Sequence, residues 1–403
     1  MEKIQSKSKN IPTSTVTPEG SNDTKTHRVF LNNISHLIEK CPNQIQIISK
    51  LIIQSISQKN ISNLRSLTEK GIPDDIPALR PFTWKILLKY LPINIYEWDS
   101  FLLKKRNEYK TFIKLIESKL GKELSNKDYK TKELLEQIIK DVSRTSFELS
   151  FFFQSTNKKM LSSSEITELY NKRKYNSKII DIKEYYSPFI TEENKTHADI
   201  LKRILLIFSI LRPDIGYHQG LNEILAPIYY CYSYDKLYEN EKEEDIEADS
   251  FWSFYNLISQ LEKTFNNDEK QEGLYLLKET LEKCLKLVDE DILITLGNKN
   301  IKLEYFCFKW FILLFSQEFN IGDIMKLWDL VFSNENKYYY LIYISLAFLL
   351  IKKTIIKEKE TIDILQEFQN FGNVDIDLLI NNSRELKIKY GEMLDEIILK
   401  SVV

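Results

Sequence analysis

Glycine and proline are scarce in this sequence, with ten of each among 403 residues. Sandwiches and barrels need many turns built from these two residues, so the counts argue against such folds. Cysteine is scarce too: Cys41, Cys231, Cys284 and Cys307 lie far apart and form no CxxC pair. This spacing excludes a disulfide framework and favours a reducing compartment. Four histidines leave little material for a zinc site.

An excess of charge of one sign is also absent. The 56 basic and 58 acidic residues give a net charge of −2, which argues against nucleic acid or general membrane-surface binding. The longest apolar run, Tyr338 to Ile351, has 14 residues, fewer than the roughly 18 expected of a membrane-spanning helix. The first ten residues contain no apolar core of a signal peptide. We therefore expect a cytoplasmic chain without a transmembrane segment, at most peripheral to intracellular membranes.

Hydrophobic residues are plentiful, at 43%, and are enough for a sizeable core. Over most of the chain they recur at helical spacing, which predicts an all-α protein. No fixed-period repeat is present, so a regular solenoid is not expected. The clearest expected helices, the last two of them buried, are 95–120, 132–140, 198–211, 303–315 and 338–351.

Changes in composition divide the chain into segments. An acidic run at 239–249 is predicted to be a solvated loop. The expected segments are a disordered polar tail at 1–27, a helical lead-in at 28–68, a main domain at 69–355 with an insertion loop at about 155–180, and a C-terminal helical extension at 356–403.

Common catalytic motifs are missing. The chain contains no GxxxxGK[ST], GxGxxG, GxSxG or HExxH sequence. It therefore has no recognisable phosphate-binding loop, nucleophile elbow or metalloprotease helix, and a self-contained enzyme of these types is not expected.

Three motifs occur in order instead. The first is GIP at 71–73, followed by Arg80 and Trp84; the second is IIKDVSRT at 138–145; the third is GYHQGLNE at 216–223. Aromatic and charged pairs follow them at Lys309-Trp310, Gln317-Glu318-Phe319 and Leu327-Trp328-Asp329.

This ordered set resembles the TBC domain of Rab GTPase-activating proteins, whose pattern includes IxxDxxR and YxQGxN, over roughly Gly71 to Phe332. The resemblance implies a two-lobed, all-α fold and a GTPase activator acting in vesicle trafficking. The partner is then a Rab-type GTPase in its GTP-bound state. This partner carries the GTP and Mg²⁺, so the chain needs no cofactor or metal of its own and is not an enzyme by itself.

The resemblance implies that Arg144 is an arginine finger and that Gln219 is a glutamine finger. The chemistry fits these residue types, because a guanidinium stabilises the charge that develops on the γ-phosphoryl oxygens and a carboxamide can orient the attacking water. The alternatives are that Arg144 forms an ordinary i,i+3 surface pair with Asp141 and that Gln219 is a plain polar residue at a helix start.

Neighbouring residues are expected to support the two fingers. Asp141 is close enough in sequence to orient the Arg144 guanidinium. Gly220 permits a close backbone approach, and Tyr217 and Asn222 support the loop.

Several charged residues outside the two finger motifs have structural interpretations. Arg80 either contacts the partner GTPase or pairs with a structural carboxylate; the sequence leaves both open. Glu318 and Asp329 are expected to pair with basic groups inside the domain.

Two other functions remain compatible with the sequence. The chain could be a catalytically silent TBC-type module that binds a GTPase or an adaptor. It could also be an unrelated helical scaffold, in which case Arg144 and Gln219 need not lie near each other.

Overall fold

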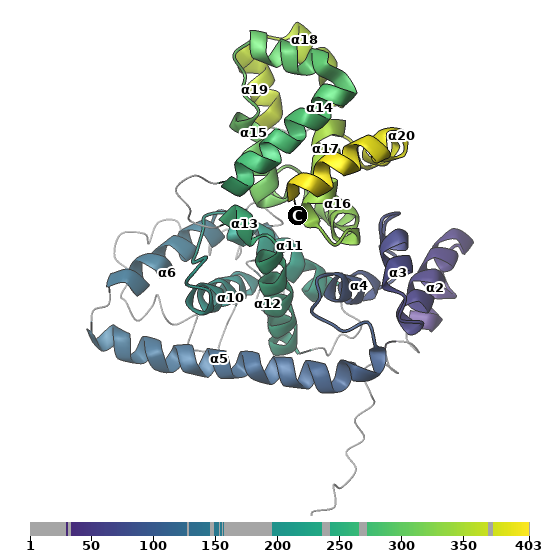
Figure 1. Ribbon diagram of the computed structural model, residues 1–403. Coiled ribbons are helices and arrows are strands. Elements are labelled where there is room, and N and C mark those ends of the chain that lie inside the picture. The colour runs from purple at the N-terminus through teal and green to yellow at the C-terminus, as the bar shows by residue number, and fades with distance from the viewer. Residues whose placement is uncertain are drawn as a thin grey trace, which may run out of the picture.

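The computed structural model describes residues 30, 34–126, 129–145, 149–152, 154, 156, 196–235, 242–265, 272–369 and 374–402. Every regular element in these ranges is a helix, as the sequence predicts (Figure 1). The predicted tail at 1–27 and the insertion at 155–180, except residue 156, lie outside the described residues.

The helices form two lobes (Figure 1). The first lobe contains α2 (Asn43–Ser57), α3 (Ile61–Thr68), α4 (Leu79–Leu87), η1 (Ile95–Glu97), α5 (Trp98–Asn126), α6 (Tyr129–Val142), α7 (Leu149–Phe152), α10 (His197–Leu211), α11 (Leu221–Tyr234), α12 (Glu243–Gln260) and α13 (Glu262–Phe265). The second contains α14 (Glu272–Asn298), α15 (Glu304–Leu313), α16 (Ile321–Ser333), α17 (Lys337–Ile351), α18 (Lys353–Glu358), α19 (Thr361–Gln369) and α20 (Ile376–Val402).

Helix α11 lies where the lobes meet. Within the first lobe it packs against α10 and α12, and across the junction it contacts α15 and α16. The long helix α5 runs along the outer side of the first lobe and packs against α12 and α10 (Figure 1). Helix α11 therefore contacts both lobes.

The second lobe is built around α17, which is buried on all sides as predicted and packs against α14, α16 and α20. The prediction of a buried helix at 303–315 is only partly correct. Helix α15 ends at Leu313 because Leu314 adopts a left-handed conformation, with φ of 51°. Its outward side is not covered either, since Tyr305 is 56% exposed.

The acidic run is not a solvated loop where the structure describes it. From Glu243 it forms α12, and Asp249 is completely buried. Asp249 accepts hydrogen bonds from Lys85 Nζ at 2.7 Å, Tyr90 Oη at 2.7 Å and Arg106 Nη2 at 2.9 Å. Burial would raise the pKa of Asp249, but Arg106 and Lys85 hold it below its usual value. The prediction was wrong because these basic partners lie on α4 and α5, far away in sequence.

Arg80 joins the lobes through Asp329. Its Nε donates to Asp329 Oδ1 at 3.1 Å and its Nη2 to the Ile72 carbonyl at 2.7 Å, while Trp84 Nε1 donates to Asp329 Oδ1 at 2.7 Å. Only 2% of Arg80 is exposed, so its guanidinium cannot reach a partner protein. The partner-binding assignment of Arg80 is therefore wrong, whereas the expected basic partner of Asp329 is confirmed.

Both flanking segments pack onto the main body. Helix α3 of the lead-in contacts α16, and α20 of the extension packs against α17 and α14. The extension also contacts the first residue of the main domain, because Arg384 Nε donates to the Glu69 carbonyl at 3.0 Å and Lys387 Nζ pairs with Glu69 Oε1 at 3.0 Å.

No helix within the described residues is both long enough and apolar enough to cross a membrane.

Candidate functional site

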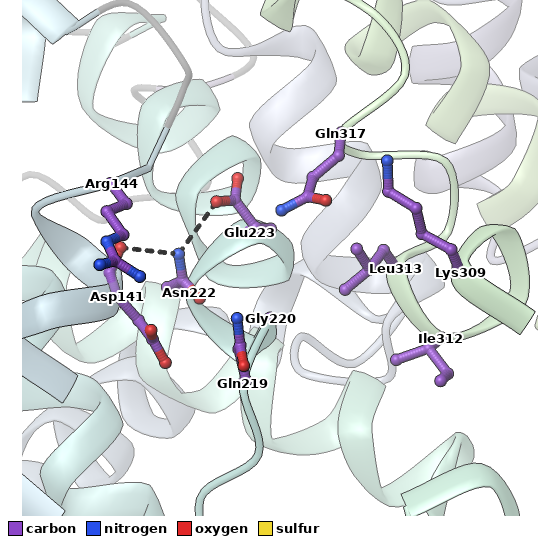
Figure 2. A pocket seen from close by; sticks show the side chains of 10 residues that line it. All are labelled: Asp141, Arg144, Gln219, Gly220, Asn222, Glu223, Lys309, Ile312, Leu313 and Gln317. Atoms are coloured by element: carbon purple, nitrogen blue, oxygen red, sulfur yellow. Dashed lines mark hydrogen bonds between the residues drawn. The ribbon is translucent and has the colours of Figure 1, made fainter. Parts of the chain in front are cut away.

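A pocket of about 490 Å³ lies at the junction of the lobes (Figure 2). The first lobe contributes the end of α6 and the start of α11, and the second contributes α15 and the loop after it. Arg144 and Gln219, 75 positions apart in sequence, both line this pocket. The unrelated-scaffold alternative, which gives no reason for the two side chains to meet, is not supported.

Arg144 stands in a turn directly after α6, and its side chain is exposed. Its backbone N–H donates to the Asp141 carbonyl at 3.0 Å, which continues the helical turn. Within the described part of the chain, no hydrogen bond or ion pair engages the guanidinium. Arg144 is thus neither half of a surface pair with Asp141 nor held directly by that carboxylate, and its charge is available at the pocket.

The Asp141 carboxylate, in the second motif, binds the third motif instead. Tyr217 Oη donates to Asp141 Oδ2 at 3.0 Å, which ties the loop before α11 to the end of α6. Burial raises the pKa of Asp141, while Tyr217 and Arg144 oppose that rise. Burial and the neighbouring Asp141 also raise the pKa of Tyr217, so its hydroxyl stays protonated as a donor. Asp141 was expected to orient the Arg144 guanidinium, but the bond that the structure gives its carboxylate joins the second and third motifs through Tyr217.

Asn222 makes a second connection between the motifs. Its Nδ2 donates to the Asp141 carbonyl at 3.3 Å, to Thr145 Oγ1 at 3.0 Å and to Glu223 Oε1 at 3.1 Å. The residue is only 3% exposed. Since Asp141 and Thr145 flank Arg144, this amide fixes both ends of the turn that carries the guanidinium. Figure 2 shows its bonds to the Asp141 carbonyl and to Glu223.

Gln219 is exposed in the turn that precedes α11, and Gly220 is the N-cap of that helix. Gly220 has φ of 101°, in the left-handed region that favours glycine. A Cβ atom here would lie 2.5 Å from Leu313 Cδ2 of α15. The close approach expected at Gly220 is therefore present: Leu313 of the second lobe packs against the backbone next to Gln219.

We expect Gly220→Ala to lower the free energy of unfolding by about 1–3 kcal/mol, through left-handed strain and displacement of Leu313. Chemical denaturation measures this. Gly297→Ala is the matched control, because Gly297 lies in α14 with open space around its Cβ position, so alanine there should be neutral or stabilising. Equal effects of the two substitutions would contradict the argument.

Sequence reasoning assigned no role to three polar residues that line the pocket: Glu223, Lys309 and Gln317. Glu223 is 3% exposed, and burial raises its pKa to about 7. Lys309 Nζ pairs with Glu318 at 2.8 Å, which confirms the expected basic partner of Glu318. Glu223 and Gln317 belong to motifs that the sequence analysis named, but nothing in their spacing indicated that Glu223 is buried or that both line one pocket.

Comparisons with known proteins agree with this architecture. A family model described as Rab-GTPase-TBC domain matches residues 154–357, half of the chain; the match contains Gln219 and begins after Arg144.

Similar sequences and structures carry related descriptions. The chain is 29% identical over 382 residues to TBC1 domain family member 13 of Homo sapiens, covering 81% of this chain and 94% of that protein. It is 24% identical over 337 residues to GTPase-activating protein GYP1 of Saccharomyces cerevisiae, covering 79% of this chain and 45% of that protein. The crystal structure of the Ypt/Rab-GAP domain of Gyp1p has a TM-score of 0.62 and 22% identity, covering 84% of this chain and 99% of that one, and thus shows the same fold.

Proposed function

We propose that this chain accelerates GTP hydrolysis by a Rab-type small GTPase in its GTP-bound state. The chain belongs to the Rab-GTPase-TBC domain family, which supports this proposal. One observation carries the proposal: an exposed arginine without a bonded partner in the described structure and an exposed glutamine line one pocket at the lobe junction. In this proposal the partner brings the GTP and Mg²⁺, and the chain acts in vesicle trafficking at membranes that carry the Rab.

Arg144 supplies positive charge in trans. During hydrolysis negative charge spreads over the γ-phosphoryl oxygens and the leaving oxygen, and a guanidinium placed there stabilises the transition state more than the ground state. Such a residue must reach beyond its own protein surface. The exposure of Arg144 and the absence of a bonded partner within the described structure meet that requirement, while the contacts from Asn222 fix its backbone.

Gln219 positions the attacking water. A carboxamide can accept a hydrogen bond from the water and donate another to a phosphoryl oxygen. The turn at 216–220 presents this side chain on the pocket side of α11, and Tyr217, two residues earlier, is bonded to the Arg144 motif. The two fingers therefore lie on backbone segments that the Tyr217–Asp141 hydrogen bond connects.

The direct test is single-turnover phosphate release from a panel of GTP-loaded Rab proteins mixed with the purified chain. At least one Rab should hydrolyse GTP faster than its intrinsic rate. A chain that binds GTP-loaded Rab proteins without changing hydrolysis of any of them would instead be the silent binding module.

Gln219→Ala is expected to reduce the acceleration on the order of 10²-fold, less than the loss expected on removing the arginine, because only the orientation of the water is lost. Single-turnover phosphate release at saturating chain concentration measures it. Gln54→Ala, at an exposed position of α2, is the matched control and should keep full acceleration. An unchanged rate in Gln219→Ala would remove this residue from the mechanism.

A further inference from the structure

The carboxyl group of Glu223 is buried at the edge of the pocket and only half satisfied. Its Oε1 accepts from Asn222 Nδ2 at 3.1 Å, whereas its Oε2 has no hydrogen-bond partner among the described residues. Figure 2 shows the Gln317 side chain turned toward this carboxyl group from the second lobe. Burying a carboxylate oxygen without a hydrogen-bond donor costs free energy, so a functional reason for keeping Glu223 at this position should be sought.

The Asn222 amide is shared among more acceptors than it has hydrogens. Its two N–H groups face Glu223 Oε1, Thr145 Oγ1 and the Asp141 carbonyl. An ionised acceptor forms a shorter hydrogen bond that is roughly twice as strong as a neutral one. An ionised Glu223 therefore forms a strong hydrogen bond with one N–H of the Asn222 amide. The other N–H of that amide then points at the turn around Arg144.

We propose that Glu223 is a positioning residue: its ionised carboxylate orients the Asn222 amide, and Asn222 holds the turn that carries Arg144. When Glu223 takes up a proton, it becomes a weaker acceptor and gains a hydroxyl that must itself find an acceptor. The amide then loses its preferred orientation. The consequence for GTP hydrolysis rests on the proposed function, but the coupling between Glu223 and Asn222 does not.

Burial, with smaller effects of the neighbouring groups, places this change near neutral pH. Burial raises the pKa of Glu223 to about 7; Asp141 on α6 adds to the rise, while the amides of Gln317 and Asn222 and the Lys309 ammonium oppose it. Tyr217, whose own pKa is raised, faces the carboxyl group as a neutral phenol.

Activity and stability should depend on pH in opposite directions through this group. The ionised form increases as pH rises through about 7, so acceleration should rise with it. Because the pKa is higher in the folded than in the unfolded state, folding favours the neutral form, and this contribution to stability is lost as pH rises. A fall in acceleration toward pH 6 therefore cannot come from unfolding driven by Glu223.

The first test compares pH profiles of accelerated phosphate release, with the intrinsic GTPase rate subtracted at each pH. Between pH 8 and pH 6 the wild-type acceleration should fall by up to about tenfold, following the ionised fraction of one group. Glu223→Gln keeps the shape and the oxygen acceptor but cannot titrate, so its acceleration should be constant over this range.

A matched control is Asp235→Asn. Asp235 is another carboxyl group whose pKa is raised by burial, to about 6, but it accepts from the Ala78 N–H away from the pocket. This variant should keep the wild-type pH profile. If Glu223→Gln also kept that profile, the pH dependence would belong to another group, and the proposal would be wrong.

A second measurement does not need GTPase activation. In protein labelled with ¹⁵N-asparagine, the Asn222 side-chain amide signal can be assigned by its loss in Asn222→Ser. It should shift with a midpoint near pH 7 in the wild type and not in Glu223→Gln. If the Asn222 amide signal of the wild type does not change with pH, the proposed coupling between Glu223 and Asn222 is wrong. A signal that titrates in a chain that accelerates no Rab supports the coupling and contradicts the proposed function instead.

Discussion

A chain carrying Arg144→Ala should leave the partner GTPase close to its intrinsic rate of hydrolysis, a loss on the order of 10³–10⁵-fold in acceleration. The reason is the loss of the only guanidinium lining the described pocket. The fold should persist, because the exposed Arg144 side chain makes no hydrogen bond or ion pair within the described structure. Single-turnover phosphate release measures the loss, and a pull-down with GTP-loaded Rab measures binding separately.

Two further variants separate charge from geometry. Arg144→Lys keeps the charge but loses the planar fork that contacts two oxygens at once, so most of the acceleration should still disappear. Lys140→Ala removes an exposed cation four residues earlier, in the last turn of α6, and should keep full acceleration. Near-normal stimulation by Arg144→Ala would refute the finger role.

Asp249→Ala should lower the free energy of unfolding by about 3–5 kcal/mol, the usual cost of leaving buried charge unpaired. Asp249 is fully buried and bonded to Lys85 and Arg106, and both cations would lose this partner. The cluster joins α12 to α4 and α5, so its loss should loosen the lobe that carries Arg144 and Gln219. Denaturant unfolding followed by circular dichroism measures the effect.

The matched control is Asp377→Ala, which removes a carboxylate paired with Lys326 at 3.3 Å on the surface. This substitution should change stability by less than about 1 kcal/mol. The contribution of Asp249 to the free energy of unfolding should also depend on pH. Its pKa is lowered in the folded state, so the contribution is present above the unfolded value near 3.9 and is lost as pH falls below it. Equal losses in the two variants would contradict the importance of the cluster.

Helix positions followed from local patterns. The predicted helix at 198–211 is α10, with Thr196 as its side-chain cap, and the predicted helix at 338–351 is α17. These predictions succeeded because helical periodicity and capping involve residues within a few positions of each other. The motif order likewise identified Arg144 and Gln219 as residues of one site, and both line the same pocket.

The partners of the charged residues did not follow from local patterns. Arg80 and Asp329 are 249 positions apart, Arg106 and Asp249 are 143 apart, and Tyr217 reaches Asp141 across 76. A charged side chain looks the same in sequence whether water or a buried counter-ion surrounds it. Only the packing of distant helices assigns its partner and its burial.

Periodicity in this chain was therefore enough to specify a helical protein and its main helices, and the ordered motifs indicated the two residues at the pocket. Which carboxylates are buried, how Asp141 and Asn222 join the two motifs, and why Glu223 has its pKa near neutrality depend on contacts between helices that are far apart in sequence. The physical difference is one of range: helix formation depends on near neighbours, whereas burial and electrostatics depend on the whole fold.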